Sequence, residues 1–225
     1  MARLARLVVA GQAHLVIQRG HGGDAVFADG IDRAGYLAAL REAAAAEQVH
    51  VHAYALLPAE VQLLATPGRP PALSRLMQAL GRRYVAAHNR RHGRSGTLWD
   101  GRFRCAVVEP GSTRLQALCL VDGAASEAGL TSAPHRLGGR RDTWLVDPPE
   151  YWALGNTPFD REAAYRALLD AGVATDVAAA LRRAALGGWA AGSAGFKADL
   201  AAAQSRPAQP RPRGRPRKAL PAGLR

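Results

Sequence analysis

Apolar side chains recur with two different periods along the first 130 residues. Residues 49–57 alternate apolar with other side chains and are followed, after a proline turn, by a second apolar segment at residues 61–65; this predicts a β-hairpin. Residues 32–47 and 73–89 repeat apolar side chains every three or four positions, which predicts two helices. The same reading predicts a short strand at residues 7–9 with a second strand, or the continuation of the first, at residues 14–18. It also predicts a strand at residues 104–108 and a helix at residues 114–123.

The resulting order is strand, helix, strand, strand, helix, strand, helix. It predicts an α+β fold, a ferredoxin-like antiparallel sheet with helices packed on one face. After residue 130 the pattern changes to a loop-rich stretch and two short helices, at residues 159–171 and 175–186. Thr157 and Pro158 form a typical start for the first of them. We therefore expect a domain over residues 1–130, an extension of loops and short helices over 131–204, and a disordered tail over 205–225.

Composition excludes several classes of protein. The chain has 225 residues, 48% hydrophobic and 21% charged, which suffices for a globular core. Its two cysteines are too few for a disulfide scaffold. No apolar run approaches the roughly 18 residues that a membrane helix needs. We expect a cytoplasmic protein that makes no membrane contact.

Positive charge is the strongest compositional signal. Lys and Arg number 30 against 18 Asp and Glu, a net charge of +12, and residues 205–225 contribute seven basic residues and no acid. A polyanion is the natural partner of such a chain, and nucleic acid is favoured over a membrane surface.

The second predicted helix concentrates arginine beside its apolar face. No acidic residue interrupts the chain between Glu60 and Asp100. A planar guanidinium pairs with phosphate oxygens through two hydrogen bonds, so this run indicates phosphate contact more than an ordinary solvated helix face. The candidate DNA-binding residues of this region are Arg75, Arg82, Arg83, Arg90, Arg91, Arg94, Arg102 and Arg104.

The tail contains the sequence PRGRPRK at residues 212–218. It resembles an AT-hook, a slim segment whose arginines enter the narrow minor groove of AT-rich duplex DNA. The alternative is a generic basic tail. The candidate contacts are Arg213, Arg215, Arg217 and Lys218.

Five short segments of the chain together carry a family resemblance. They are GQAHLVIQRG (residues 11–20), HAYALLP (52–58), MQALGRRY (77–84), NRRHG (89–93) and GTLWDGR (96–102). In combination they resemble the REP-associated tyrosine transposases, relatives of the insertion-sequence-200-like (HUH-type) transposases. The resemblance covers about residues 1–130. It implies a bacterial, nucleoid-associated protein that binds single-stranded or hairpin DNA, either as a monomer or as a homodimer.

The resemblance also implies two catalytic parts, and this sequence departs from both. Family members hold a divalent metal with a His-hydrophobic-His motif on the strand after the Leu-Pro turn, where this chain has Glu60-Val61-Gln62. Residues two apart on a strand point the same way. Glu60 and Gln62 can therefore offer oxygen ligands to Mg²⁺ or Mn²⁺, or be an ordinary polar strand face.

The second departure is at the nucleophile. Family members attack DNA with a tyrosine, and Leu120 stands at that position here. None of the remaining tyrosines is an obvious substitute, and Tyr84 falls on the apolar side of its predicted helix. His88 and His92 lie one helical turn apart, a spacing that can bind metal, but the sequence favours a basic, DNA-facing helix over a metal site here.

Three functional hypotheses remain from the sequence. The favoured one is a DNA-binding protein that has lost strand-transfer activity and needs no cofactor. The alternatives are an active single-strand nuclease or transposase that uses Mg²⁺ or Mn²⁺ on substituted ligands, and a decayed gene product.

Overall fold

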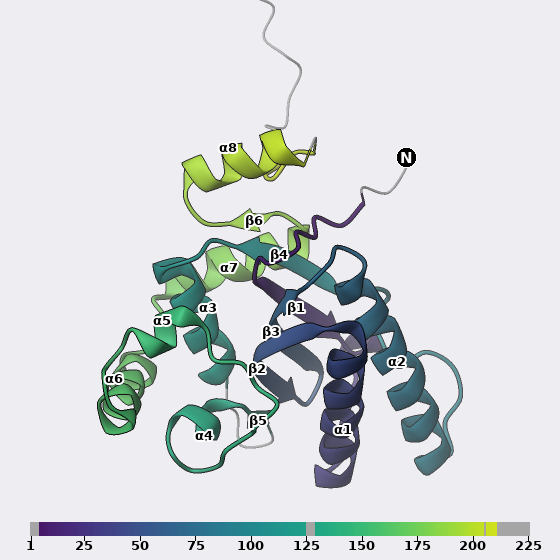
Figure 1. Cartoon of the computed structure of the whole chain (residues 1–225). Coiled ribbons are helices and arrows are strands. Elements are labelled where there is room, and N and C mark those ends of the chain that lie inside the picture. The colour runs from purple at the N-terminus through teal and green to yellow at the C-terminus, as the bar shows by residue number, and fades with distance from the viewer. Residues whose placement is uncertain (1–4, 125–128, 205, 211–225) are drawn as a thin grey trace, which may run out of the picture.

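A computed structural model of the chain describes residues 5–124, 129–204 and 206–210 (Figure 1). Residues 5–124 fold in the predicted order of elements, apart from the short strand expected at residues 7–9. The bounds are β1 (His14–Arg19), α1 (Gly30–Glu47), β2 (Val49–Leu57), β3 (Glu60–Pro67), α2 (Ala72–Arg91), β4 (Arg104–Val108) and α3 (Ser112–Asp122), with a 3₁₀ turn at His21–Gly23 after β1.

The strands form one sheet with the order β5-β2-β3-β1-β4-β6. Its four long strands, β1 to β4, pair antiparallel throughout, and their order is that of a ferredoxin-like fold. The predicted fold class is therefore confirmed. Two short strands extend the sheet: β5 (Leu130–Thr131) pairs antiparallel with β2, and β6 (Ala190–Ala191) pairs parallel with β4.

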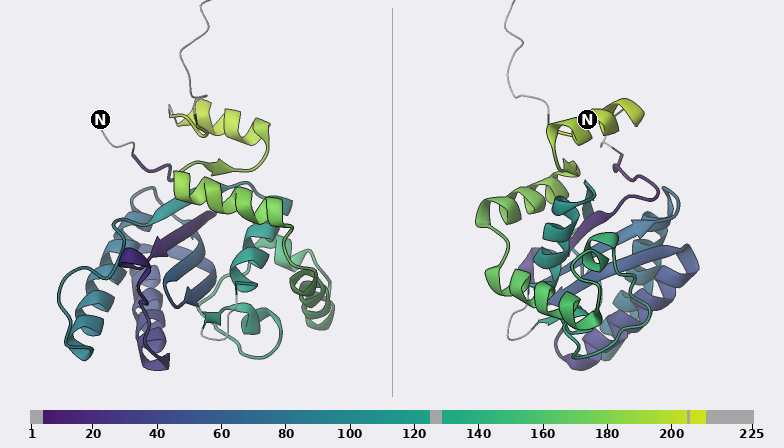
Figure 2. Two further views of the ribbon diagram at one scale, coloured as in Figure 1. Left: turned by 180° about the vertical axis from the view of Figure 1, so that it is seen from behind. Right: turned by 60° about the vertical axis from the view of Figure 1, so that its left-hand side comes forward.

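The sheet is covered on both faces, and this differs from the expected single helical layer. Val16 and Leu63 belong to a core beneath α1 and α2, whereas Leu15, Ile17 and Leu64 belong to a second core beneath α3 and α7. Figures 1 and 2 show α1 and α2 on one side and α3 and α7 on the other. Because successive strand residues point to opposite faces, these apolar side chains require cover on both sides.

The extension contributes most of the structure that covers the second face of the sheet. Its elements are α4 (Ala133–Arg136), α5 (Pro149–Trp152), α6 (Pro158–Ala171), α7 (Thr175–Gly187) and α8 (Ala194–Ala203). The two predicted short helices correspond to α6 and α7, and Thr157 caps α6 with Asp160 in a reciprocal capping box. No helix in the described part of the chain is long and apolar enough to cross a membrane.

Residues 7–9 do not form the predicted strand. Leu7 is nevertheless buried, in a third small core with Val107 and Leu200. The apolar character of Leu7 therefore correctly indicated burial, but it did not indicate a strand.

A buried ionic network ties the extension to the first 124 residues. Arg136 is fully buried, and its Nη1 donates to Asp122 Oδ2 at 2.9 Å while its Nη2 donates to the carbonyl of His52. The Tyr165 hydroxyl donates to the same Asp122 oxygen at 2.7 Å. One carboxylate of α3 thus joins α4, α6 and the sheet. A buried charge left without its partner is strongly destabilising.

We predict that Arg136→Met lowers the free energy of unfolding by about 3–5 kcal/mol, because it leaves Asp122 buried without its cation. Chemical denaturation monitored by circular dichroism measures the change. Arg141→Met, at an exposed arginine five positions along the chain, is the matched control, with an expected change below about 0.5 kcal/mol. Equal effects of the two substitutions would contradict this account of the network.

Candidate nucleic-acid interface

Two of the predicted DNA-binding arginines on α2 are held by carboxylates of α1. Arg83 forms an ion pair with Glu42. Arg91 donates to Asp29 Oδ2 at 2.5 Å and to Asp32 Oδ1 at 2.6 Å. The segment between Glu60 and Asp100 has no acidic residue, yet part of the positive charge on this helix face is neutralised. The balancing acids come from a different helix, which spacing along the chain cannot reveal.

Other predicted arginines remain exposed. Arg82, Arg90 and Arg94 project from the second half of α2 and the turn after it, and no ion pair with them is found among the described residues. Arg75 lies in the first turn of the same helix, at its opposite end. The predicted arginine surface is thus divided along the helix and is not one continuous stripe.

The structure brings Arg75, Arg102 and Arg104 together along two adjoining cavities of about 470 Å³ and 250 Å³. Arg6, Arg102 and Phe103 line both cavities, so the two lie side by side, and we call them together the basic groove. It runs between the start of α2, the segment entering β4 and the turn after α7. Its arginines are Arg6, Arg75, Arg102, Arg104 and Arg206.

No aspartate or glutamate lines either cavity among the described residues. Arg206 donates from Nη2 to the carbonyl of Gly188 at 3.0 Å, whereas its Nε and Nη1 are shielded from solvent and have no hydrogen-bond partner in the described structure. Burial lowers the pKa of this guanidinium, so an anion beside it would relieve an electrostatic cost. The groove is therefore suited to bind an anion.

Aromatic rings accompany these cations. The guanidinium of Arg6 lies 3.9 Å from the ring centroid of Phe103, and that of Arg206 lies 6.0 Å from the ring of Trp189. Trp189 is partly exposed and lines the smaller cavity. Sequence reasoning missed Arg6, Trp189 and Arg206 because they come from both ends of the chain, and only the tertiary fold places them beside Arg102.

The residues at the positions where the family resemblance implies metal ligands and a nucleophile lie on the same side of the sheet. Gln62 is paired in register with Ile17 on β1 and Ala55 on β2, both members of the core beneath α3 and α7. Leu120 packs against the same core from α3. The Gln62 side chain donates to Glu60 Oε1 at 2.8 Å, so the two strand residues do point the same way, as their spacing predicts.

The carboxylate of Glu60 nevertheless forms ion pairs with two arginines. Arg182 of α7 pairs with both of its carboxylate oxygens, at 2.9 and 3.0 Å, and Arg19 donates to Oε2 at 3.0 Å. Burial raises the pKa of the Glu60 carboxyl, but these hydrogen bonds and charges outweigh burial and lower it overall. A divalent cation at this place would have to displace Arg182 and Arg19. The arrangement does not favour Glu60 and Gln62 as metal ligands.

None of the tyrosines is placed as a candidate nucleophile. All five tyrosines of the chain are buried, and burial raises the pKa of each phenol above its ordinary value. The hydroxyl of Tyr84 donates to the carbonyl of Val26 at 2.6 Å, which confirms its predicted place in the core. A buried phenol with a raised pKa neither reaches DNA nor forms the phenolate that attacks phosphorus.

The AT-hook-like segment, with Arg213, Arg215, Arg217 and Lys218, lies outside the described residues.

Among the solved structures that resemble the chain are two transposases, and the likeness to each is partial. No family model and no curated protein matches the chain. A REP-associated tyrosine transposase bound to a REP hairpin is 13% identical over 54% of this chain and 70% of that one, with a TM-score of 0.45. A protein of Deinococcus radiodurans assigned as a transposase is 23% identical over 48% of this chain and 88% of that one, with a TM-score of 0.38.

We predict that Arg182→Ala lowers the free energy of unfolding by roughly 1–2 kcal/mol at pH 7, because it removes a bidentate partner from a carboxylate that is only partly exposed. The neighbouring Arg183→Ala, at an exposed position of the same helix, is the control and should change it by less than about 0.5 kcal/mol.

The difference between wild type and Arg182→Ala also depends on pH. The folded-state pKa of Glu60 lies below the ordinary value of 4.5, so the pair stabilises the fold fully above that value and loses this effect as pH falls through the folded-state pKa. Denaturation curves from pH 7 down to about pH 3 should therefore converge for the two proteins. A constant difference over this range would show that Arg182 acts through packing and not through Glu60.

Proposed function

We propose that this chain is a DNA-binding protein of the REP-associated tyrosine transposase family, that it binds single-stranded or hairpin DNA in the bacterial nucleoid, and that it does not transfer strands. The basic groove carries this proposal. Five arginines line this groove without a carboxylate among its described residues, in a chain of net charge +12. Phosphate is the anion that such a groove would meet along a nucleic acid.

The groove also supports a preference for unpaired bases. The partly exposed Trp189 lies among its cations, and stacking of bases on an aromatic ring needs bases that are free of a duplex. Arg102 closes the GTLWDGR segment, one of the motifs on which the family resemblance rests. The segment is anchored by buried Leu98 and Trp99, and a backbone hydrogen bond runs from the Asp100 N–H to the Arg19 carbonyl at 2.8 Å.

The state of the catalytic positions supports binding without cleavage. Leu120 has no nucleophilic atom, and the five tyrosines are buried. The carboxylate of Glu60 is engaged by Arg182 and Arg19, so the route to an active enzyme through Glu60 and Gln62 lacks an open ligand. We further propose that residues 205–225 add a second contact to DNA, in which the basic residues of the AT-hook-like segment bind the minor groove of AT-rich duplex.

A triple variant, Arg75→Ala, Arg102→Ala and Arg104→Ala, tests the groove. We predict at least about tenfold weaker binding of a labelled REP-like DNA hairpin near 0.1 M salt, because up to three phosphate contacts are lost. The plot of log affinity against log salt should become shallower by about 0.7 for each contact removed from single-stranded DNA. Fluorescence anisotropy over a salt series measures both quantities.

The control is Arg41→Ala, Arg141→Ala and Arg183→Ala, which removes the same charge at exposed positions outside the groove. Residues 205–225 are present in both proteins, so the contribution of the tail cancels. Loss of affinity confined to the groove variant supports the proposed interface. An equal change in both variants would mean that only net charge matters and that the groove is not the binding surface.

A further inference from the structure

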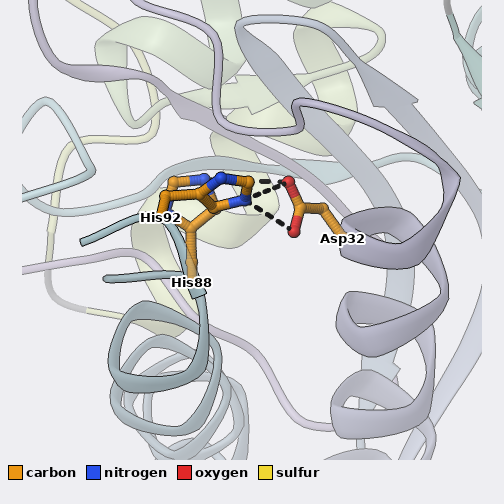
Figure 3. Close-up of side chains that lie close together, drawn as sticks. All are labelled: Asp32, His88 and His92. Carbon is orange, nitrogen blue, oxygen red and sulfur yellow. Dashed lines mark hydrogen bonds and ion pairs between the residues drawn. The ribbon is translucent and has the colours of Figure 1, made fainter. Parts of the chain in front are cut away.

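The start of α1 and the end of α2 bring together one carboxylate and two imidazoles. Asp32 lies in the first turn of α1, and His88 and His92 lie in the last turn of α2 and at its C-cap. Figure 3 shows the two rings converging on the carboxylate. The His92 Nε2 lies 3.0 Å from Asp32 Oδ2, and the His88 Nε2 lies 3.9 Å from the same oxygen.

The spacing of the three ligand atoms suits a single metal ion. One ligand atom from each side chain lies within 4.8 Å of the others, and this is the one such group of three among the described residues. Zinc bonds of about 2.0–2.2 Å place tetrahedral ligand atoms roughly 3.3–3.5 Å apart. The observed 3.0 and 3.9 Å lie on either side of that value, so small rotations of the side chains suffice.

His88 is the side chain that the rest of the structure leaves unexplained. Its side chain is 3% exposed, and its Nδ1 has no hydrogen-bond partner in the described structure. Its Nε2 is too far from Asp32 for a hydrogen bond. A buried ring nitrogen without a partner is costly, and the side-chain hydrogen bond with Asn89 that also acts on this imidazole does not satisfy Nδ1. Burial also lowers its pKa, which favours the neutral form that coordinates metals.

The carboxylate is already oriented for this role. Asp32 Oδ1 accepts from Arg91 Nη1 at 2.6 Å, while Arg91 is itself held by Asp29 through two further hydrogen bonds, at 2.9 and 2.5 Å. The backbone N–H of Ala28 donates to Oδ2 at 2.8 Å. Such contacts fix the direction of a ligating carboxylate and leave a lone pair of Oδ2 toward the two rings.

We propose that Asp32, His88 and His92 bind one transition-metal dication of the zinc class, with water in the fourth position. Two imidazoles and one carboxylate form a ligand set that such ions favour over Mg²⁺. The ion would join the beginning of α1 to the end of α2, immediately before the segment that carries Arg94 and Arg102. The site is separate from Glu60 and Gln62 and does not depend on DNA binding.

The test titrates the tag-free, metal-stripped full chain with Zn²⁺ by calorimetry and with Co²⁺ by visible absorption. We expect equimolar binding and a d–d spectrum of a four-coordinate site. At a Zn²⁺ concentration about a hundredfold above Kd, the thermal midpoint should rise by about 5–10 °C. His88→Ala and His92→Ala should each weaken binding about a hundredfold or more. His50→Ala, at an exposed histidine of β2, should bind like wild type.

His92 is partly exposed, so His92→Ala keeps the proposal testable even if removing buried His88 unfolds the chain. Equimolar binding that is lost in His92→Ala and kept in His50→Ala supports the site. Absent equimolar binding, or binding unchanged in a folded His92→Ala, overturns it. In that case the contact between His92 and Asp32 is a structural hydrogen bond only.

Discussion

The rest of the structure depends on a sheet that is apolar on both faces. Leu15 and Leu64 point to one side and Val16 and Leu63 to the other, and each is almost fully buried. Because neither face can be left in water, the chain needs helices beyond the two that a ferredoxin-like fold supplies. Helix α7 meets that need on the second face. Its position has two consequences for function: Arg182 reaches Glu60, and the turn after the helix brings Trp189 to the basic groove.

The sequence predicts elements well where the apolar pattern is long, and poorly where pairing is decided by distant segments. Strand β2 and the capped start of α6 lie where period and capping residues place them. Strands β5 and β6 are two residues each, and their alanine, leucine and threonine carry no distinctive period. They form because the edges of β2 and β4 are available, which is a property of the fold and not of the local sequence.

The same limit applies to the site. Arg102 and Arg104 could be proposed from the motif and the charge run around them, and the structure places both in the basic groove. The charge run also suggested Arg83 and Arg91, whose acidic partners lie some 40 to 60 positions away on α1. Arg206 joins the groove from the other end of the chain. Charge balance is set by neighbours in space, so an acid-free segment of sequence overstates the free positive surface.

The central claim is that this chain holds DNA without cutting it. The most direct test mixes the purified full chain with a labelled REP-like single-stranded hairpin and Mn²⁺ and analyses the same sample on native and denaturing gels. The account predicts a shifted band on the native gel and an intact, unattached strand on the denaturing gel. A cut strand, or DNA joined covalently to the protein, would contradict it. The chain would then have a nucleophile other than the five buried tyrosines, in spite of the leucine at position 120.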